Sequence, residues 1–288
     1  MTTDLATAVA GWAPPPTSTS DRITSWPVGA LAALLDLPAP VGPLPPLWHW
    51  LGFLDHPRQS ELGEDGHPAD GHFLPPIPER RRMIAGGRIR VHASLPVDEP
   101  ITRMSTLDRV TVKHGRSGDM AFVTVRHDYR VESGGIAVTE EQDVVYRSQG
   151  AGQARAVVRP PAEAAPETDW RFEITPDPAM LFRFSALTYN THRIHYDEPY
   201  VTGVEGFPGL VVHGPLLALL LLEIPRRFVP DRRVASFDYR LMTPSFAGDR
   251  LVVGGSASGG SASGDTIELA AHAVGLANSI TGIVTLYP

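Results

Sequence analysis

A period of two residues is visible within a long proline-free part of the first half of the chain. No proline occurs between Ile101 and Arg159, and proline is kept out of inner strands because it cannot donate the ladder hydrogen bond. Residues 122, 124, 126 and 128 (Phe, Thr, Arg and Asp) interleave with Val, Val, His and Tyr. This is the period of a strand. The pattern predicts strands at residues 87–95, 103–114, 119–132 and 135–147.

The same order of elements, a helix followed by long strands, recurs in the second half. A helix is predicted from Val28 to Leu35, with Pro27 at its first position, and an apolar run predicts another from Pro215 to about Glu223. Further strands are predicted at residues 233–246, 249–259, 264–277 and 279–287. Between the halves, a stretch rich in Ala, Pro, Gly and Gln without periodicity is typical of a linker.

A helix that is apolar on all sides, as residues 216–222 are, must be surrounded by other elements. A long antiparallel sheet wrapped around one central helix achieves this, and two such units side by side give an α+β fold. We therefore expect an N-terminal unit at residues 1–150, a linker at 151–164 and a C-terminal unit at 165–288.

Composition and charge exclude several classes of function. The 288 residues contain 25 Lys and Arg against 32 Asp and Glu, a net charge of −7, so no basic excess is present to bind nucleic acid. The absence of cysteine excludes disulfides, thiolate metal sites and cysteine nucleophiles. The longest apolar stretch, residues 209–222, is shorter than the roughly 20 residues of a membrane-spanning helix. With no signal-peptide pattern at the N-terminus, a cytoplasmic protein is expected.

The densest group of polar residues lies at Phe184–Asp197. It contains the amide of Asn190 and the imidazole of His195, five residues apart. An amide can hold a water molecule without changing charge, and an imidazole can take a proton from that water and return it. The following segment begins a helix at Gly214 and Pro215, where free N–H groups can stabilise a developing oxyanion. Together these groups suit the addition of water to a carbonyl-conjugated double bond.

These motifs resemble the MaoC-like hydratase and dehydratase family of hotdog folds. The segments Phe184–Thr188, Asn190–His195 and Gly209–Leu216 are more narrowly similar to its hydroxyacyl-thioester dehydratase type 2 branch, near which mesaconyl-CoA (C4 thioester) hydratases belong. In the N-terminal half, similar motifs are Pro43–Trp50, Phe73–Pro76, Arg82–Met83 and Glu140–Arg147. The resemblance implies a double hotdog: a degenerate N-terminal hotdog that shapes the acyl pocket, and a catalytic C-terminal one.

The resemblance also implies roles for individual residues. Asn190 stands where most of the wider family carries an aspartate that shares the water with histidine, so His195 is expected to be the sole acid and base and Asn190 to position the water. The Gly214 N–H is expected to polarise the thioester carbonyl. Arg183 and Arg193, beside the motif, are the expected partners of a free substrate carboxylate.

Other residues near the motif leave alternatives open. His213 either orients the turn or lines the pocket, and Asp197 either caps the loop or bonds His195 and fixes its tautomer. His192 is expected to be a bonded structural residue. No thiol or carboxylate set completes a metal site with the histidines of the motif, so no metal is expected. Arginine clusters at 80–82, 226–227 and 232–233 are candidates for binding the phosphates of coenzyme A.

The expected function is a hydro-lyase that reversibly adds water to a 2-enoyl thioester. The resemblance leans toward a branched C5 dicarboxylic acyl-CoA such as mesaconyl-CoA. Alternatives are a 3-hydroxyacyl-carrier-protein dehydratase, a hotdog thioesterase and a non-catalytic thioester-binding protein. No cofactor is expected beyond the coenzyme A or acyl-carrier arm of the substrate, and the chain is expected to form a homodimer.

Overall fold

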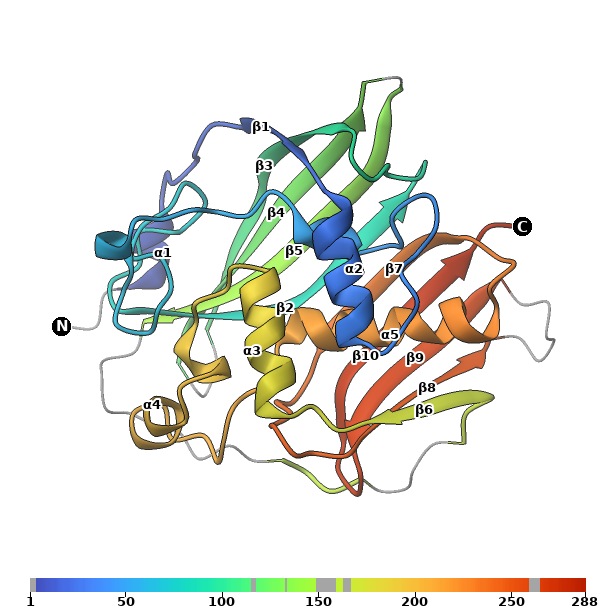
Figure 1. The fold of residues 1–288 in the computed structure, drawn as a ribbon. Helices are drawn as coiled ribbons and strands as arrows, with labels where there is room; N and C mark the ends of the chain where they lie inside the picture. The colour runs from blue at the N-terminus through green and yellow to red at the C-terminus, as the bar shows by residue number, and fades with distance from the viewer. Residues whose placement is uncertain (1–3, 115–117, 133, 149–158, 163–166, 259–264) are drawn as a thin grey trace.

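One antiparallel sheet of ten strands forms the framework in the computed structural model, which describes residues 4–114, 118–132, 134–148, 159–162, 167–258 and 265–288 (Figure 1). The strand order is β1-β3-β4-β5-β2-β7-β10-β9-β8-β6. The strands are β1 (Thr17–Arg22), β2 (Arg80–Val91), β3 (Pro100–Lys113), β4 (Met120–Val131), β5 (Ile136–Ser148), β6 (Trp170–Ile174), β7 (Val234–Leu241), β8 (Leu251–Ala257), β9 (Thr266–Ala273) and β10 (Asn278–Leu286).

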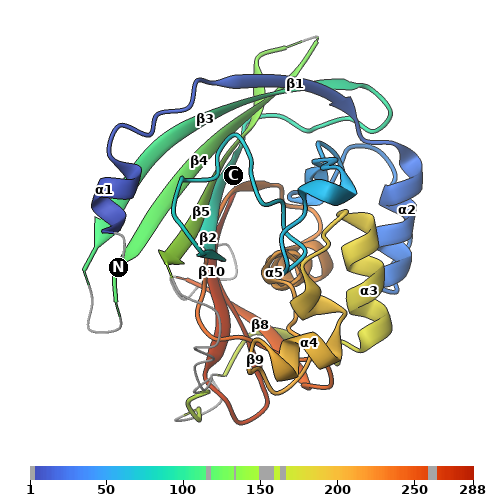
Figure 2. The ribbon, with the colours of Figure 1, turned by 90° about the vertical axis from the view of Figure 1, so that its left-hand side faces the viewer.

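The helices lie on the concave side of the curved sheet, and Figure 2 shows α5 end-on within that curve. They are α1 (Leu5–Val9), α2 (Ser25–Leu34), α3 (Pro178–Leu187), α4 (Glu198–Gly203) and α5 (Gly214–Phe228), with three short 3-10 turns at Trp48–Leu51, Gln59–Glu61 and Arg193–His195. Every residue from Leu216 to Pro225 is buried, and α5 packs against β6 to β10. The prediction of a central helix wrapped by a long sheet is therefore confirmed for the C-terminal half.

The two halves join where β2 pairs with β7. The pairing aligns Gly86 with Arg240 and Gly87 with Tyr239. A Cβ atom on Gly86 would collide with the backbone carbonyl oxygen of Tyr239, so the approach of the two strands requires a residue without a side chain. An ion pair of 2.6 Å between Arg90 and Asp238 crosses the same seam. The seam joins the N-terminal and C-terminal strands into one continuous sheet, and together with the helices this sheet forms an α+β fold.

Most predicted elements are present with small shifts, and the structure also contains elements that were not predicted. The first predicted strand, 87–95, is displaced: β2 begins at Arg80 and ends at Val91, because the next two N–H groups, of His92 and Ala93, both donate to Ala137 and turn the chain. The helix at 28–35 starts earlier, at Ser25. The sequence pattern did not indicate α1, β1, β6, α3 or α4.

Strands β1 to β5 come from residues below 150, and β6 to β10 from residues above 165. Most of the predicted linker, 151–164, lies outside the described residues. Its described part contacts the connections between the C-terminal strands, since Arg159 pairs with Asp249 at 2.5 Å and Pro161 bridges Leu276. The exact unit boundaries stay a prediction. No helix of the described ranges is long and apolar enough to cross a membrane.

Candidate active site

The loop that follows α3 carries the predicted polar motif. Asp177 caps the helix by accepting from Met180 N at 2.7 Å, and the helix ends when Tyr189 adopts a left-handed conformation with φ 49°. The side-chain oxygen of Asn190 accepts from the backbone N–H of His192 at 3.0 Å. The Asn190 amide oxygen is therefore engaged by the loop itself, and its NH₂ group is left to hold a ligand.

His195 is buried in the 3-10 turn after this loop, with 7% of its surface exposed. Its Nδ1 lies 2.7 Å from the carbonyl oxygen of Val211 and must donate to it, because a carbonyl has no proton to give. The neutral ring consequently presents Nε2 as a proton acceptor. Burial lowers the pKa of His195 to about 4, although the Val211 bond acts in the opposite direction. At neutral pH this histidine is an uncharged base.

His213 and Gly214 form the start of α5 directly beside His195. The rings of His195 and His213 stack, with centroids 3.7 Å apart and planes inclined by 17°. His213 is fully buried, and its Nε2 pairs with the hydroxyl of Ser185 at 2.8 Å. The side chain of His213 thus joins the start of α5 to α3. Gly214 is the first residue of α5, and its N–H donates to no acceptor within the described ranges.

A cavity of about 270 Å³ opens between the two halves and reaches the motif at Asn190 and Pro215. His195, His213 and Gly214 are not among its lining residues. The N-terminal half supplies most of the wall. Its lining residues are Trp50, Gly52, Phe53, Leu54, Asp55, Pro57, His67, Pro68, Arg82, Ile84, Arg103, Tyr129, Gln142 and Val144, opposite Phe184, Thr188, Tyr189, Asn190, Thr191, Pro215 and Tyr239.

The residues expected to hold a substrate carboxylate lie elsewhere. Arg183 is exposed on α3 and does not line the cavity. Arg193 is engaged by Asp197, with Nη2 2.8 Å from the carboxylate, and by the carbonyl of Glu64 at 3.0 Å. Asp197 also caps α4 by accepting from Tyr200 N at 3.1 Å. The structure therefore shows the capping alternative for Asp197, and it leaves neither arginine facing the cavity.

The arginine clusters are also largely engaged by protein acceptors. Arg226 and Arg227 pair with Glu223, and Arg232 pairs with Asp265. Arg81 pairs with Glu205, and Arg80 donates to backbone carbonyls. Within the described residues, Arg82 has no such partner and lines the cavity.

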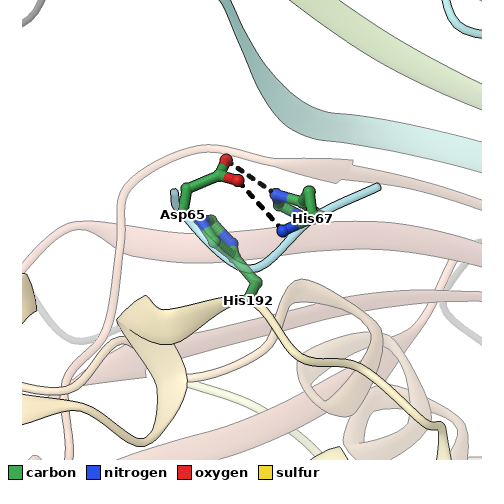
Figure 3. A group of neighbouring side chains, drawn as sticks. All are labelled: Asp65, His67 and His192. Atoms are coloured by element: carbon green, nitrogen blue, oxygen red, sulfur yellow. Dashed lines mark hydrogen bonds and ion pairs between the residues drawn. The ribbon is translucent and has the colours of Figure 1, made fainter. Parts of the chain in front are cut away.

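An Asp-His pair from the N-terminal half lies against the motif, as Figure 3 shows. Asp65 accepts from the Nδ1 of His67 at 3.0 Å and from its backbone N–H at 2.9 Å. The ring of His192 packs on that of His67, with centroids 3.9 Å apart. Burial lowers the pKa of both histidines, so both are neutral at pH 7. Burial opposes the charge on Asp65, but the side-chain and backbone hydrogen bonds from His67 outweigh it and lower the pKa of the carboxyl.

Among the described residues, Asp65, His67 and His192 also form the one group of at least three His, Cys, Asp or Glu side chains that could hold a metal ion. Their ligand atoms lie within 4.8 Å of one another. Two imidazoles and a carboxylate are a donor set that zinc accepts in other proteins. Sequence reasoning missed this group because Asp65 and His67 are more than a hundred residues from His192, and no local pattern joins them.

The loop at residues 63–68 is docked on the loop that carries Asn190 by hydrogen bonds to backbone carbonyls. The N–H of Arg193 donates to the carbonyl of Asp65 at 2.9 Å, and the hydroxyl of Thr191 donates to the carbonyl of Gly66 at 2.5 Å. Gly66 has a φ of 85°, and a Cβ there would collide with the backbone carbonyl oxygen of Thr191. Glycine at this position is what allows the two loops to meet.

A second buried polar cluster stands behind the cavity wall of the N-terminal half. The Glu140 carboxylate accepts from Trp50 at 2.8 Å, Tyr129 at 3.0 Å and Gln142 at 2.7 Å, and its other partner is His49 at 2.8 Å. Burial raises the pKa of Glu140, but these hydrogen bonds outweigh it and bring it to about 2. The carboxylate is therefore ionised, and its hydrogen-bonding capacity is filled.

Similarity to known proteins shows the family of this chain. The family model for hydroxyacyl-thioester dehydratase type 2 matches residues 47–247. The chain belongs to the hydroxyacyl-thioester dehydratase type 2 family. It is 48% identical over 225 residues to a mesaconyl-C(4)-CoA hydratase of Chloroflexus aurantiacus, covering 75% of this chain and 78% of that one. It is 26% identical over 241 residues to the mitochondrial hydroxyacyl-thioester dehydratase type 2 of Schizosaccharomyces pombe, covering 75% and 79%.

Solved structures agree on the fold. The crystal structure of HtdX of Mycobacterium tuberculosis superposes with a TM-score of 0.63 at 17% identity, covering 95% of this chain and all of that one. A MaoC-like dehydratase of Phytophthora capsici superposes with a TM-score of 0.65 at 12% identity, covering 98% and 97%. The predicted α+β double hotdog is confirmed. The predicted hydro-lyase class is confirmed by the family and by the hydratase and dehydratase relatives.

Proposed function

We propose that this member of the family adds water to a short, branched 2-enoyl-CoA that carries a free carboxylate, of the mesaconyl-C4-CoA type. The 48% identity to the Chloroflexus hydratase supports this acyl class. The single observation that carries the chemistry is the bond from Nδ1 of His195 to the Val211 carbonyl, at 2.7 Å. It fixes the tautomer in which Nε2 is free to accept a proton.

The proposed reaction uses three groups of the C-terminal half. Asn190 holds a water molecule through its NH₂ group, and Nε2 of His195 takes a proton from that water as its oxygen bonds to carbon β. The π electrons of the double bond shift to form a bond between carbon α and the carbonyl carbon, and the carbonyl π pair moves onto the thioester carbonyl oxygen, which the N–H of Gly214 stabilises at the start of α5. The imidazolium of His195 then returns the proton to carbon α, which balances the reaction. Because its pKa is lowered to about 4, this imidazolium gives up its proton readily.

The substrate-binding roles given to Arg183, Arg193, His213 and Asp197 are not carried into this proposal. Arg183 is exposed on α3, Arg193 and Asp197 form an ion pair, and the side chain of His213 is bonded to Ser185. The Ser185 bond and the stacked ring of His213 instead support His195 from behind. No metal or redox cofactor takes part in the proposed steps. A homodimer and a cytoplasmic location remain predictions.

The test is a spectrophotometric hydration assay that follows loss of the enoyl-thioester absorbance while free thiol is titrated. Wild-type protein should consume the enoyl band without releasing thiol. His195→Ala should lower kcat by about 10²–10⁴-fold, the usual contribution of a general acid-base group. His114→Ala changes an exposed histidine and serves as the matched control. Thiol release would indicate a thioesterase, and turnover only of carrier-protein thioesters would indicate the acyl-carrier-protein dehydratase alternative.

A further inference from the structure

The cavity is lined by an arginine that forms no ion pair with any residue that the structure describes. Arg103, on β3, lines the same cavity as Asn190. Its Nε is buried and has no hydrogen-bond partner in the described part of the chain. Its Nη1 makes one long bond, 3.3 Å, to the carbonyl of Phe53. Arg103 as a whole is half-buried, but a buried N–H donor such as its Nε is unfavourable unless a ligand supplies an acceptor.

Other arginines of the same sheet have their guanidinium donors filled by carboxylates. Arg88 binds both Glu141 and Asp143 at 2.7 Å, and Arg126 binds Asp128 at 3.0 Å. Arg103 has no ion pair among the described residues, although Glu140 belongs to the neighbouring polar cluster. That carboxylate is already taken by four side chains, so it offers Arg103 no free lone pair in a suitable place.

The guanidinium of Arg103 is held in place rather than free to swing into water. It stacks over the ring of Phe53, with Cζ 5.0 Å from the centroid. The charge of Arg103 also acts on the buried His127. Burial lowers the pKa of that imidazole, and the positive charge of Arg103 lowers it further. Two other charged residues that line the cavity are Arg82 and the exposed Asp55, so the arginines outnumber this acid.

We propose that Arg103 binds the free carboxylate of the acyl group and thereby selects dicarboxylic enoyl thioesters over monocarboxylic ones. A carboxylate matches the planar fork of a guanidinium and would fill the unused donors of Arg103. The apolar part of the acyl group would contact the rings of Trp50, Phe53 and Tyr129, which line the same wall. This inference rests on the proposed hydratase function and assigns its substrate specificity to the N-terminal half.

The experiment compares two thioesters that differ only in the group on the carbon that takes the water. Fumaryl-CoA carries a carboxylate there, and crotonyl-CoA carries a methyl group. Hydration is measured as kcat/KM for both substrates in the wild type and in Arg103→Met, which keeps the apolar stem but removes the charge. The intrinsic reactivities of the substrates cancel when the fumaryl-to-crotonyl ratio of the variant is divided by that of the wild type.

The ratio should fall on the order of 10²-fold in Arg103→Met, as expected when one partner of a desolvated charge pair is removed. Arg103→Lys should recover part of the preference, because lysine restores the charge but not the fork. Arg109→Met, an exposed position on the same strand, should keep the wild-type ratio. Residual crotonyl-CoA hydration shows that Arg103→Met is folded.

Three outcomes would overturn the inference while leaving the hydratase function intact. They are a wild type with no preference for fumaryl-CoA, an equal loss for both substrates in Arg103→Met, and a selective loss in Arg82→Met instead of Arg103→Met. Failure of the wild type to hydrate either thioester would instead contradict the proposed function itself.

Discussion

Replacing Gly66 by alanine should separate the two halves at the loop that carries Asn190. Gly66 has a φ of 85°, in the left-handed region where an alanine costs about 1–2 kcal/mol. The added methyl group would also collide with the carbonyl oxygen of Thr191, a backbone atom that cannot swing away. Because Thr191 lies between Asn190 and His192, relief of the collision must move the loop that carries Asn190 or the loop that carries Asp65 and His67.

The size of the effect follows from the contacts at this junction. Moving the loops apart would weaken the bonds from Arg193 N to Asp65 O, 2.9 Å, and from Thr191 to Gly66 O, 2.5 Å. At about 1 kcal/mol for each bond, with the backbone strain added, the expected loss of stability is about 3–4 kcal/mol. A displacement of about 1 Å in the water-holding loop should lower kcat/KM on the order of 10²-fold.

Gly42→Ala provides the matched control. Gly42 also has a positive φ, 97°, but a Cβ there meets nothing within 4 Å. This variant should lose only the strain, about 1–2 kcal/mol, and should retain wild-type hydration kinetics. Urea unfolding gives the stability of both variants, and the enoyl-thioester assay gives their activity. Equal stability losses in the two variants, with full activity in Gly66→Ala, would refute the argument that this contact positions the site.

Three further outcomes are expected. Ser185→Ala removes the buried partner of His213 Nε2, 2.8 Å away, and should destabilise the protein by about 1–3 kcal/mol in urea unfolding, whereas Ser185→Thr, which keeps a hydroxyl, should lose less. Burial lowers the pKa of His127 and His195 from 6.5 to about 4, so as pH falls these histidines are protonated in the unfolded chain before they are protonated in the folded one. The free energy of unfolding should therefore be highest above pH 6.5 and should decrease between pH 6.5 and pH 4, by roughly 1–2 kcal/mol per histidine for each pH unit. A free energy of unfolding that does not change over this range would contradict the prediction. Dialysis against EDTA should leave hydration unchanged, because Asp65 and His67 already satisfy each other; lost activity restored by zinc would instead make the trio with His192 a metal site.

Strand positions were predictable because alternation is a local property of the chain. The pattern at residues 119–132 becomes β4, Met120–Val131, and an inner strand shows such a period without help from distant residues. Helix α3 was missed because its residues were interpreted as part of the polar motif. A usable signal was present: Asp177 followed by Pro178 is a typical helix start, and the structure uses it as one.

That Asn190 and His195 lie in one short segment was predictable for a similar reason. Asn190 and His195 are five residues apart, so any compact loop keeps them near each other. The tautomer of His195 was not predictable, because it depends on a tertiary contact between Nδ1 and the carbonyl of Val211, sixteen residues away. Arg183 and Arg193 were chosen for proximity in sequence, yet a helix surface exposes one and Asp197 engages the other.

The residues that face the substrate cavity from the N-terminal half are positioned by pairing between the halves. β2 meets β7 only because Gly86 permits the approach of Tyr239, and that meeting places the wall with Arg103 opposite Asn190. The groups proposed to move protons thus lie in one half, and most of the cavity wall lies in the other. It follows that substitutions on the wall can change which acyl group is accepted while the bond between His195 and Val211 stays intact. An N-terminal unit that carries no Asn/His motif can therefore determine the specificity of the enzyme without taking part in its chemistry.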